Sequence, residues 1–170
     1  MTQSPEDILI ATYNSAKKQS VSTLLSALPD DCAQELRTIV KNAEILKGVV
    51  GVTLTSIVYK VLNPSQDIRY HQNHMPNGYS GRTFDTKYVT PFLKEKFRHF
   101  AMAESAWLTR SLEQPHPYDS KYPGKIQNKE VKAAFLSILS RLQANRDLAP
   151  KMLVALLALM IEASAEDTSL

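Results

Sequence analysis

The stretch "APKMLVALLALMIEAS", residues 149–164, is apolar on nearly every side when it is read as a helix. Such a helix needs protein around all of its faces, so we expect a central helix or one that forms an interface with a partner domain. The chain then continues into the polar sequence "EASAEDTSL". This sequence is consistent with a short tail or with the N-terminal piece of a longer protein.

Amphipathic segments earlier in the chain predict helices that would surround this stretch. "SPEDILIATYNSA", residues 4–16, and "DDCAQELRTIVKNAEIL", residues 30–46, each begin with residues that favour a helix start. The β-branched residues of "VVGVTLTSIVYKVLNP", residues 49–64, also favour a strand, but its length and apolar spacing favour a buried helix. The clearest pattern is in residues 127–145, where one helical stripe contains Val131, Ala134, Phe135, Ile138, Leu139 and Leu142.

The length and composition of the chain limit its class. A chain of 170 residues is long enough for one domain with a substantial core. No uninterrupted apolar run approaches the roughly 18 to 20 residues that cross a bilayer, and the first residues do not resemble a signal peptide. The single cysteine, Cys32, excludes an internal disulfide. We expect one mainly α domain over residues 1–170, cytoplasmic and with no membrane partner.

The middle third of the chain differs from this helical frame in charge and composition. Residues 67–132 carry eleven Lys or Arg against seven Asp or Glu, together with all four histidines and five of the seven tyrosines. Positive charge with aromatic and amide side chains suits a polyanion, although a solvated polar face is the alternative. The segment "DIRYHQNHMPNGYSGRTFDTKYVTPF", residues 67–92, predicts a long ordered polar loop region on the frame. A short strand or hairpin near residues 79–90 is a further expectation.

The polar residues of this region are of the types that bind double-stranded DNA. Arginine pairs with guanine, Asn and Gln pair with adenine, and Ser and Thr contact phosphates. Arg82 and Arg110 are the first candidates for base contacts, and Lys87, Lys94 and Lys121 would neutralise phosphates. The alternative is that these residues hydrogen-bond to one another in an ordered loop. The predicted DNA-binding residues are Arg69, His71, Gln72, Asn73, Asn77, Tyr79, Ser80, Arg82, Thr83, Lys87, Lys94, Thr109, Arg110, Ser111, Gln114 and Lys121.

Catalytic and metal-binding patterns receive less support from the sequence. The (D/E)-x-K spacing of many Mg²⁺ nucleases occurs three times, which is close to chance for this composition. Only "TFDTKYV", residues 83–89, has apolar flanks at strand spacing. With Asp67 as a second acid, it gives an alternative catalytic set of Asp67, Asp85 and Lys87. His71 and His74 have H-x-x-H spacing, but the residues around them break a helix, so we predict no metal site.

Three long strings resemble a known family. "GYSGRTFDTKYVTPFL", "MAESAWLTRSLEQPHPY" and "YPGKIQNKEVKAAFL" are similar to the N-terminal half of type II restriction endonucleases of the SacI family, over roughly residues 45–140. The resemblance implies enzymes that cut duplex DNA at short palindromes, need Mg²⁺ and act as dimers. It also implies a nuclease core with a Glu-x-Lys strand further along, and nothing after residue 140 has that character.

The combined prediction is a sequence-specific DNA-binding part of such an endonuclease. We expect no catalytic residue and no cofactor in this chain, with Mg²⁺ belonging to the full nuclease. Expected partners are double-stranded DNA and either a nuclease domain or a second copy in a homodimer. A complete small Mg²⁺ endonuclease is one alternative. A helical protein-interaction module, in which the last helix pairs with a partner domain, is the other.

Overall fold

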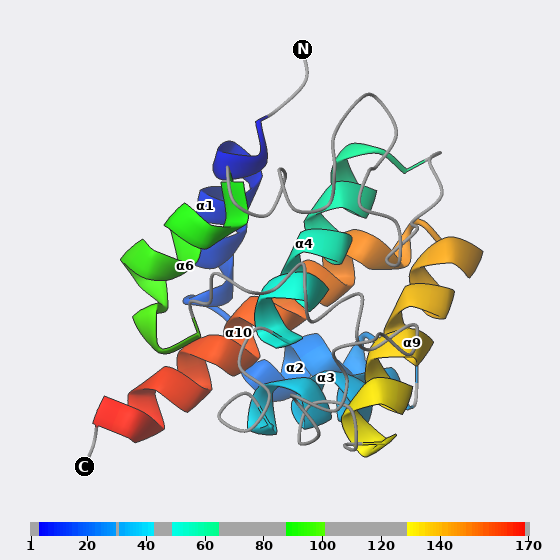
Figure 1. The fold of residues 1–170 in the computed structure, drawn as a ribbon. Coiled ribbons are helices and arrows are strands. Elements are labelled where there is room, and N and C mark those ends of the chain that lie inside the picture. Colours follow the sequence, from blue (N-terminus) through cyan, green and yellow to red (C-terminus); the bar gives the residue numbers. More distant parts are fainter. Residues whose placement is uncertain (1–3, 30, 43–48, 65–87, 101–128, 169–170) are drawn as a thin grey trace, which may run out of the picture.

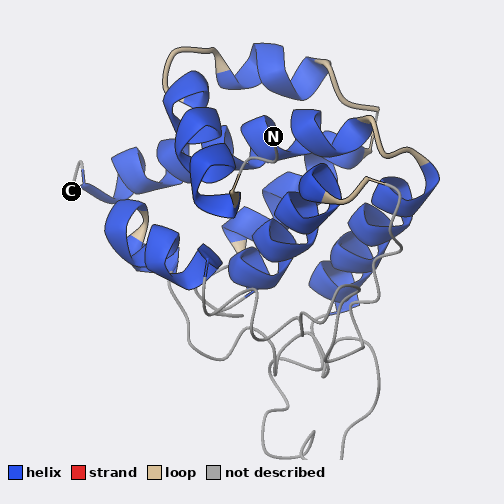
Figure 2. Cartoon of the chain, turned by 90° about the horizontal axis from the view of Figure 1, so that it is seen from above, coloured by secondary structure: helices blue, strands red, loops and turns tan. Residues whose placement is uncertain are grey.

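A computed structural model of the chain describes residues 4–29, 31–42, 49–64, 88–100 and 129–168 (Figure 1). Within these ranges the fold is mainly α, as predicted, and Figure 2 shows helices joined by loops and no strand. The described elements are α1 (Pro5–Ala16), α2 (Val21–Ser26), α3 (Cys32–Lys41), α4 (Val49–Leu62), α6 (Thr90–Lys96), the 3₁₀ helix η3 (Arg98–Phe100), α9 (Lys129–Ala144) and α10 (Leu148–Thr168).

The long apolar helix α10 is the central element of the bundle. It contacts α1, α2, α3, α4 and α9, and Figure 1 shows it crossing the molecule diagonally between these helices. Its side chains from Met152 to Met160 are buried, apart from the half-buried Val154. In the structure α10 is therefore a central helix, which is the first of the two roles that the sequence predicted.

The same helix is long and apolar enough to cross a membrane when only length and composition are considered. The window Leu148–Ala165 has a mean hydropathy of 1.7, and it includes the charged residues Lys151 and Glu162. Within the bundle, however, 56% of this window is buried against other parts of the chain. Burial by protein on several sides accounts for the apolar composition of a core helix equally well.

Helix α4 resolves the ambiguity between strand and helix in residues 49–64. Leu54, Ile57 and Val58 are fully buried, as the helical spacing predicted. The polar side chains between them are buried as well, and the Thr55 hydroxyl donates to the Gly51 carbonyl oxygen at 2.8 Å. This intrahelical bond satisfies the hydroxyl without a polar surface. Burial on several faces therefore outweighs the weak preference of β-branched residues for strands.

The ends of the N-terminal helices follow the predicted start signals in part. Ser4 caps α1 by accepting a hydrogen bond from the Asp7 amide at 3.1 Å, and Pro5 occupies the first turn. The sequence offers Asp30 or Asp31 as the cap of α3. Asp31 occupies the N-cap position, but its backbone is helical and its side chain makes no capping bond. The short helix α2 was not predicted, and Ser20 caps it through the Thr23 amide.

A polar cluster joins α3 to α9 across 106 residues of sequence. Arg141 donates two hydrogen bonds to the Glu35 carboxylate, from Nε at 2.8 Å and from Nη2 at 3.3 Å. The Ser137 hydroxyl donates to the same carboxylate at 2.7 Å. The Arg141 and Glu35 side chains are 26% and 17% exposed, so water screens the pair weakly. The hydrogen bond to Glu35 raises the pKa of Arg141 and keeps the guanidinium charged. This cluster fixes how α3 packs on α9.

We expect the Glu35→Gln variant to lower the free energy of unfolding by about 1–3 kcal/mol, because it leaves Arg141 with a weaker partner in a half-buried site. The measurement is urea unfolding followed by circular dichroism. The matched control is Arg37→Gln, which breaks an exposed 3.7 Å ion pair between α3 and Glu162 and should cost under about 1 kcal/mol. Equal losses of unfolding free energy in the two variants would mean that the Glu35 cluster stabilises the fold no more than an exposed ion pair does.

The Cys32 thiol lies beside this cluster and is fully buried. Burial raises the pKa of Cys32 from 9.0 to about 11, and the nearby Glu35 charge acts in the same direction while Arg141 opposes it. The thiol is therefore protonated at neutral pH. Because the folded pKa is the higher one, this group contributes stability below pH 9 that is lost as the pH rises towards 11.

We expect a thiol reagent at pH 8 to label Cys32 in the folded chain at least about 100-fold more slowly than in the urea-unfolded chain, because only the thiolate reacts. The labelling rate should rise with pH beyond 9 without a plateau below pH 10. Labelling of the folded chain at the unfolded rate would show that the thiol is neither buried nor protonated.

Candidate nucleic-acid interface

Lys94, on α6, is the one predicted DNA-binding residue that lies within the described ranges, and its side chain is exposed. The alternative catalytic residues Asp67, Asp85 and Lys87 lie outside the described residues, as do residues 79–87 of the expected strand or hairpin. Residues 88–90 lead into α6 in helical conformation. The other predicted DNA-binding residues outside the described ranges are Arg69, His71, Gln72, Asn73, Asn77, Tyr79, Ser80, Arg82, Thr83, Thr109, Arg110, Ser111, Gln114 and Lys121.

Helix α6 presents a basic outer face because its inner face is anchored by apolar side chains. Phe92, Leu93 and Phe97 are buried, while Lys94 and Lys96 are exposed in the last turn. The helix ends where Phe97 leaves helical conformation, at φ −142° and ψ 58°. Beyond Phe97, Arg98 is exposed and Phe100 is buried. Residues 90–100 thus alternate between core anchors and exposed basic side chains.

Tyr13 on α1 provides the contact that brings α6 against the rest of the bundle. Its ring meets Phe97 at 5.4 Å between centroids and Phe92 at 6.1 Å, both edge-to-face at 82°. Phe100 extends the aromatic cluster through Phe97 at 6.3 Å. Edge-to-face pairs are directional, so the cluster sets the orientation of α6 on α1 as well as its position.

The same tyrosine ring brings two lysines together from distant parts of the sequence. The Lys17 Nζ lies 5.3 Å from the Tyr13 ring centroid, and the Lys96 Nζ lies 5.5 Å from it. Cation–π attraction holds each ammonium near the ring while its outer side stays in solvent. The Lys96 ammonium also lies 3.6 Å from the neighbouring Glu95 carboxylate. Both cations therefore contact the same ring, at the junction of α1 and α6.

We call this surface the α1–α6 basic patch, and Figure 1 shows its two helices side by side. Lys17 and Lys96 form its centre at the Tyr13 ring, and the exposed basic residues that lie near them in the sequence are Lys18, Lys94 and Arg98. Glu95 is the acidic residue among them. The patch can attract a polyanion by long-range charge and bind its phosphates by direct contact.

The sequence alone identified Lys94 but missed the rest of the patch. Both basic runs are visible, as "KK" at residues 17–18 and "KEKFRH" at residues 94–99. Nothing in the sequence indicates that they meet, because the contact depends on how Tyr13 packs between Phe92 and Phe97. The i, i+4 spacing of Leu9 and Tyr13, which puts both on one face of a helix, is the signal of this packing in the sequence.

The described residues contain no group of three or more His, Cys, Asp or Glu side chains that could hold a metal ion. Comparisons of the chain with protein-family models, with curated proteins and with solved structures found no match. The similarity to restriction endonucleases therefore rests on the three sequence strings alone.

We expect Tyr13→Leu to lower the free energy of unfolding by about 1–3 kcal/mol, because it removes two edge-to-face pairs while it keeps an apolar side chain. Tyr13→Phe is the matched control. It retains the ring and should cost less than about 1 kcal/mol. Thermal unfolding measures both variants, and a Phe variant as unstable as the Leu variant would assign the effect to the hydroxyl instead.

Proposed function

We propose that this chain binds double-stranded DNA as the recognition part of a restriction endonuclease of the SacI type. The observation that carries the proposal is the convergence of Lys17 and Lys96 on one tyrosine ring, next to the predicted phosphate contact Lys94. In this proposal the α1–α6 basic patch binds the phosphate backbone. It does so without reading sequence, because lysine contacts to phosphates carry no base information.

The patch has the physical properties that phosphate binding requires. Its basic residues are exposed, and Lys17 and Lys96 contact the same tyrosine ring, so one polyanion could meet both. Tyr13 orders Lys17 and Lys96 before binding, which reduces the side-chain entropy lost on association. The net charge of +3 adds a weak general attraction.

Base recognition would come from residues 69–82 and 107–116, which contain Arg82 and Arg110, the first candidates for base contacts. Helix α6 begins eight residues after the end of the first of these stretches, at Thr90. A duplex bound on the α1–α6 basic patch would meet α6 at its last turn, where Lys94 and Lys96 lie. In this proposal α6 positions the DNA, and residues such as Arg82 and Arg110, which lie outside the described residues, read it.

The proposal leaves catalysis to another part of the enzyme. The chain would need no cofactor of its own, and Mg²⁺ would belong to a nuclease domain or to the assembled homodimer. The alternative of a protein-interaction module has less support, because α10 buries its apolar side chains within this chain. Little apolar surface on that helix is then left for a partner domain.

The test measures binding of the chain to random and selected duplexes over a series of salt concentrations. We expect affinity to fall steeply with salt, and the double variant Lys17→Gln/Lys96→Gln to weaken all duplexes alike and reduce the salt slope by about 1–2. The matched control is Lys151→Gln, which removes an exposed charge from α10. Arg82→Ala or Arg110→Ala should cost about 1–3 kcal/mol on the selected sequence and little on others.

Two outcomes would contradict the proposal. Affinity that is flat across salt, or equally reduced in Lys151→Gln, would remove the α1–α6 basic patch as a phosphate-binding surface. Mg²⁺-dependent cleavage by the wild-type chain that is lost in Asp85→Ala, with binding intact, would favour the complete nuclease that uses Asp67, Asp85 and Lys87.

A further inference from the structure

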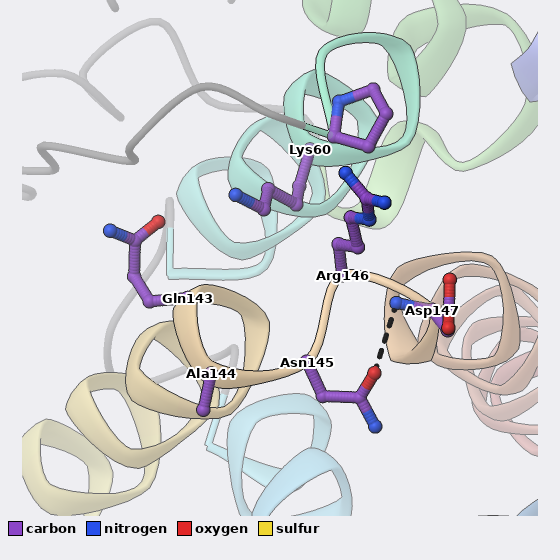
Figure 3. Close-up of a pocket in the computed structure, with 7 residues that line it drawn as sticks. Lys60, Gln143, Ala144, Asn145, Arg146 and Asp147 are labelled. Atoms are coloured by element: carbon purple, nitrogen blue, oxygen red, sulfur yellow. Dashed lines mark hydrogen bonds between the residues drawn. The ribbon is translucent and has the colours of Figure 1, made fainter.

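A polar pocket of about 490 Å³ lies at the C-terminal end of α4, against the turn between α9 and α10 (Figure 3). Lys60 and Pro64 line it from the α4 side, and residues 143–147 line it from the turn. Its volume falls within the range of small-molecule sites, about 300–1,000 Å³, but its lining is polar where most such sites are apolar. The lining therefore favours a compact, strongly hydrogen-bonding ligand.

Two basic side chains from different elements meet at this pocket. Lys60 is only 4% exposed, although it carries an ammonium group, and Figure 3 shows it extending from α4 into the space that faces Gln143. Arg146 extends from the turn towards α4 (Figure 3) and is exposed. A nearly buried ammonium beside a guanidinium disfavours a cationic ligand and favours an anion.

The turn also supplies fixed polar groups. The Asn145 side-chain oxygen accepts a hydrogen bond from the Asp147 amide at 3.1 Å (Figure 3). That bond fixes the orientation of the Asn145 side chain, whose NH₂ group is a donor. Asp147 adds one negative charge to the lining against the two positive charges of Lys60 and Arg146. Among the side chains that line the pocket, positive charges therefore outnumber negative ones.

We propose that this pocket binds a phosphate group, with Lys60 as a point charge and Arg146 as a planar donor pair. A phosphate offers several strong acceptor oxygens, which suits a fork of guanidinium donors beside a compact ammonium. Lys60 and Arg146 also interact elsewhere in the chain. An ammonium has three N–H donors and a guanidinium five, so each can bind a phosphate oxygen in addition to its existing partner.

The phosphate could belong to a free nucleotide or to the backbone of a nucleic acid, and the pocket chemistry is the same for both. The inference does not depend on the α1–α6 basic patch, which lies on other elements. A purely structural role for the two side chains is the competing explanation, because Lys60 is in the last turn of α4 and Arg146 follows the end of α9. Basic residues at these places stabilise the carbonyl ends of helices.

The experiment measures thermal unfolding of the full chain with increasing inorganic phosphate, against chloride at the same ionic strength. We expect a saturable rise in Tm with phosphate that chloride does not reproduce. Arg146→Gln should weaken the apparent phosphate affinity about tenfold or more, since it removes the charge and most of the donors. Lys151→Gln, an exposed charge outside the pocket lining, should leave the affinity unchanged.

Lys60→Met removes the buried charge and preserves the long apolar stem, so it tests the role of that charge if the variant folds. If it does not fold, Arg146→Gln still tests the inference. A phosphate effect that persists unchanged in Arg146→Gln, or one that chloride reproduces, would overturn the inference. A variant that is less stable but shows an undiminished phosphate response would also overturn it, since only the structural role would remain.

Two further arms identify the source of the phosphate. Tighter binding of a nucleoside 5′-monophosphate than of a short duplex would assign the pocket to free nucleotides. Competition between inorganic phosphate and the duplex, lost in Arg146→Gln, would assign it to a nucleic-acid backbone. The Lys17→Gln/Lys96→Gln variant should respond to inorganic phosphate like the wild type, so failure of DNA binding at the α1–α6 basic patch can be told apart from failure at the pocket.

Discussion

The apolar surface of α10 has to be covered on every side, and the arrangement of the other helices follows from that requirement. A helix with one polar face can lie at the edge of a bundle, but α10 has no such face between Met152 and Met160. Helices α1, α2, α3, α4 and α9 each contribute part of the cover. Burial of one large apolar side chain contributes about 1.5–3 kcal/mol, so leaving any side of α10 open would cost a large part of a typical domain's net stability.

Burial of this kind is not directional, and more specific contacts decide how the surrounding helices are oriented. The Glu35 carboxylate accepts bonds from Ser137 and Arg141 and so fixes α3 on α9. The Tyr13 ring makes edge-to-face contacts that fix α6 on α1. In both places a geometric interaction sets the angle and register of a helix pair that the apolar core alone would leave adjustable.

The sequence predicted the helices well where their periodicity was long enough to recognise. The buried stripe of α9, from Val131 to Leu142, was predicted in full, and α4 was correctly assigned as helical despite its β-branched residues. The six residues of α2 are too few to show a period, so the helix was missed. Asp31 lies at the N-terminal end of α3, where its residue type favours a capping bond, but its side chain makes none.

The candidate sites were less predictable, because they depend on contacts between residues that are distant in the chain. Lys94 is a candidate phosphate contact from its residue type alone. Lys17 becomes a candidate only in the structure, because its ammonium lies against the Tyr13 ring. Lys60 lies within an apolar helix, and the sequence gives no sign that the α9–α10 turn lies against it. Charge in a sequence is visible one residue at a time, while a binding surface requires the packing that brings several charges together.

The position of α10 in the chain has a consequence for how the protein folds. Helix α10 covers apolar surface on α1, α2, α3, α4 and α9, and it is synthesised after all of them. These earlier helices therefore leave the ribosome before α10 can cover their apolar faces. Pairs such as α1 with α10 and α3 with α9 give the fold many contacts of long sequence separation, which slows folding relative to a bundle of sequential hairpins. Until residues 148–168 are synthesised, the apolar faces that α10 covers have no partner, so the complete core can form only after that point.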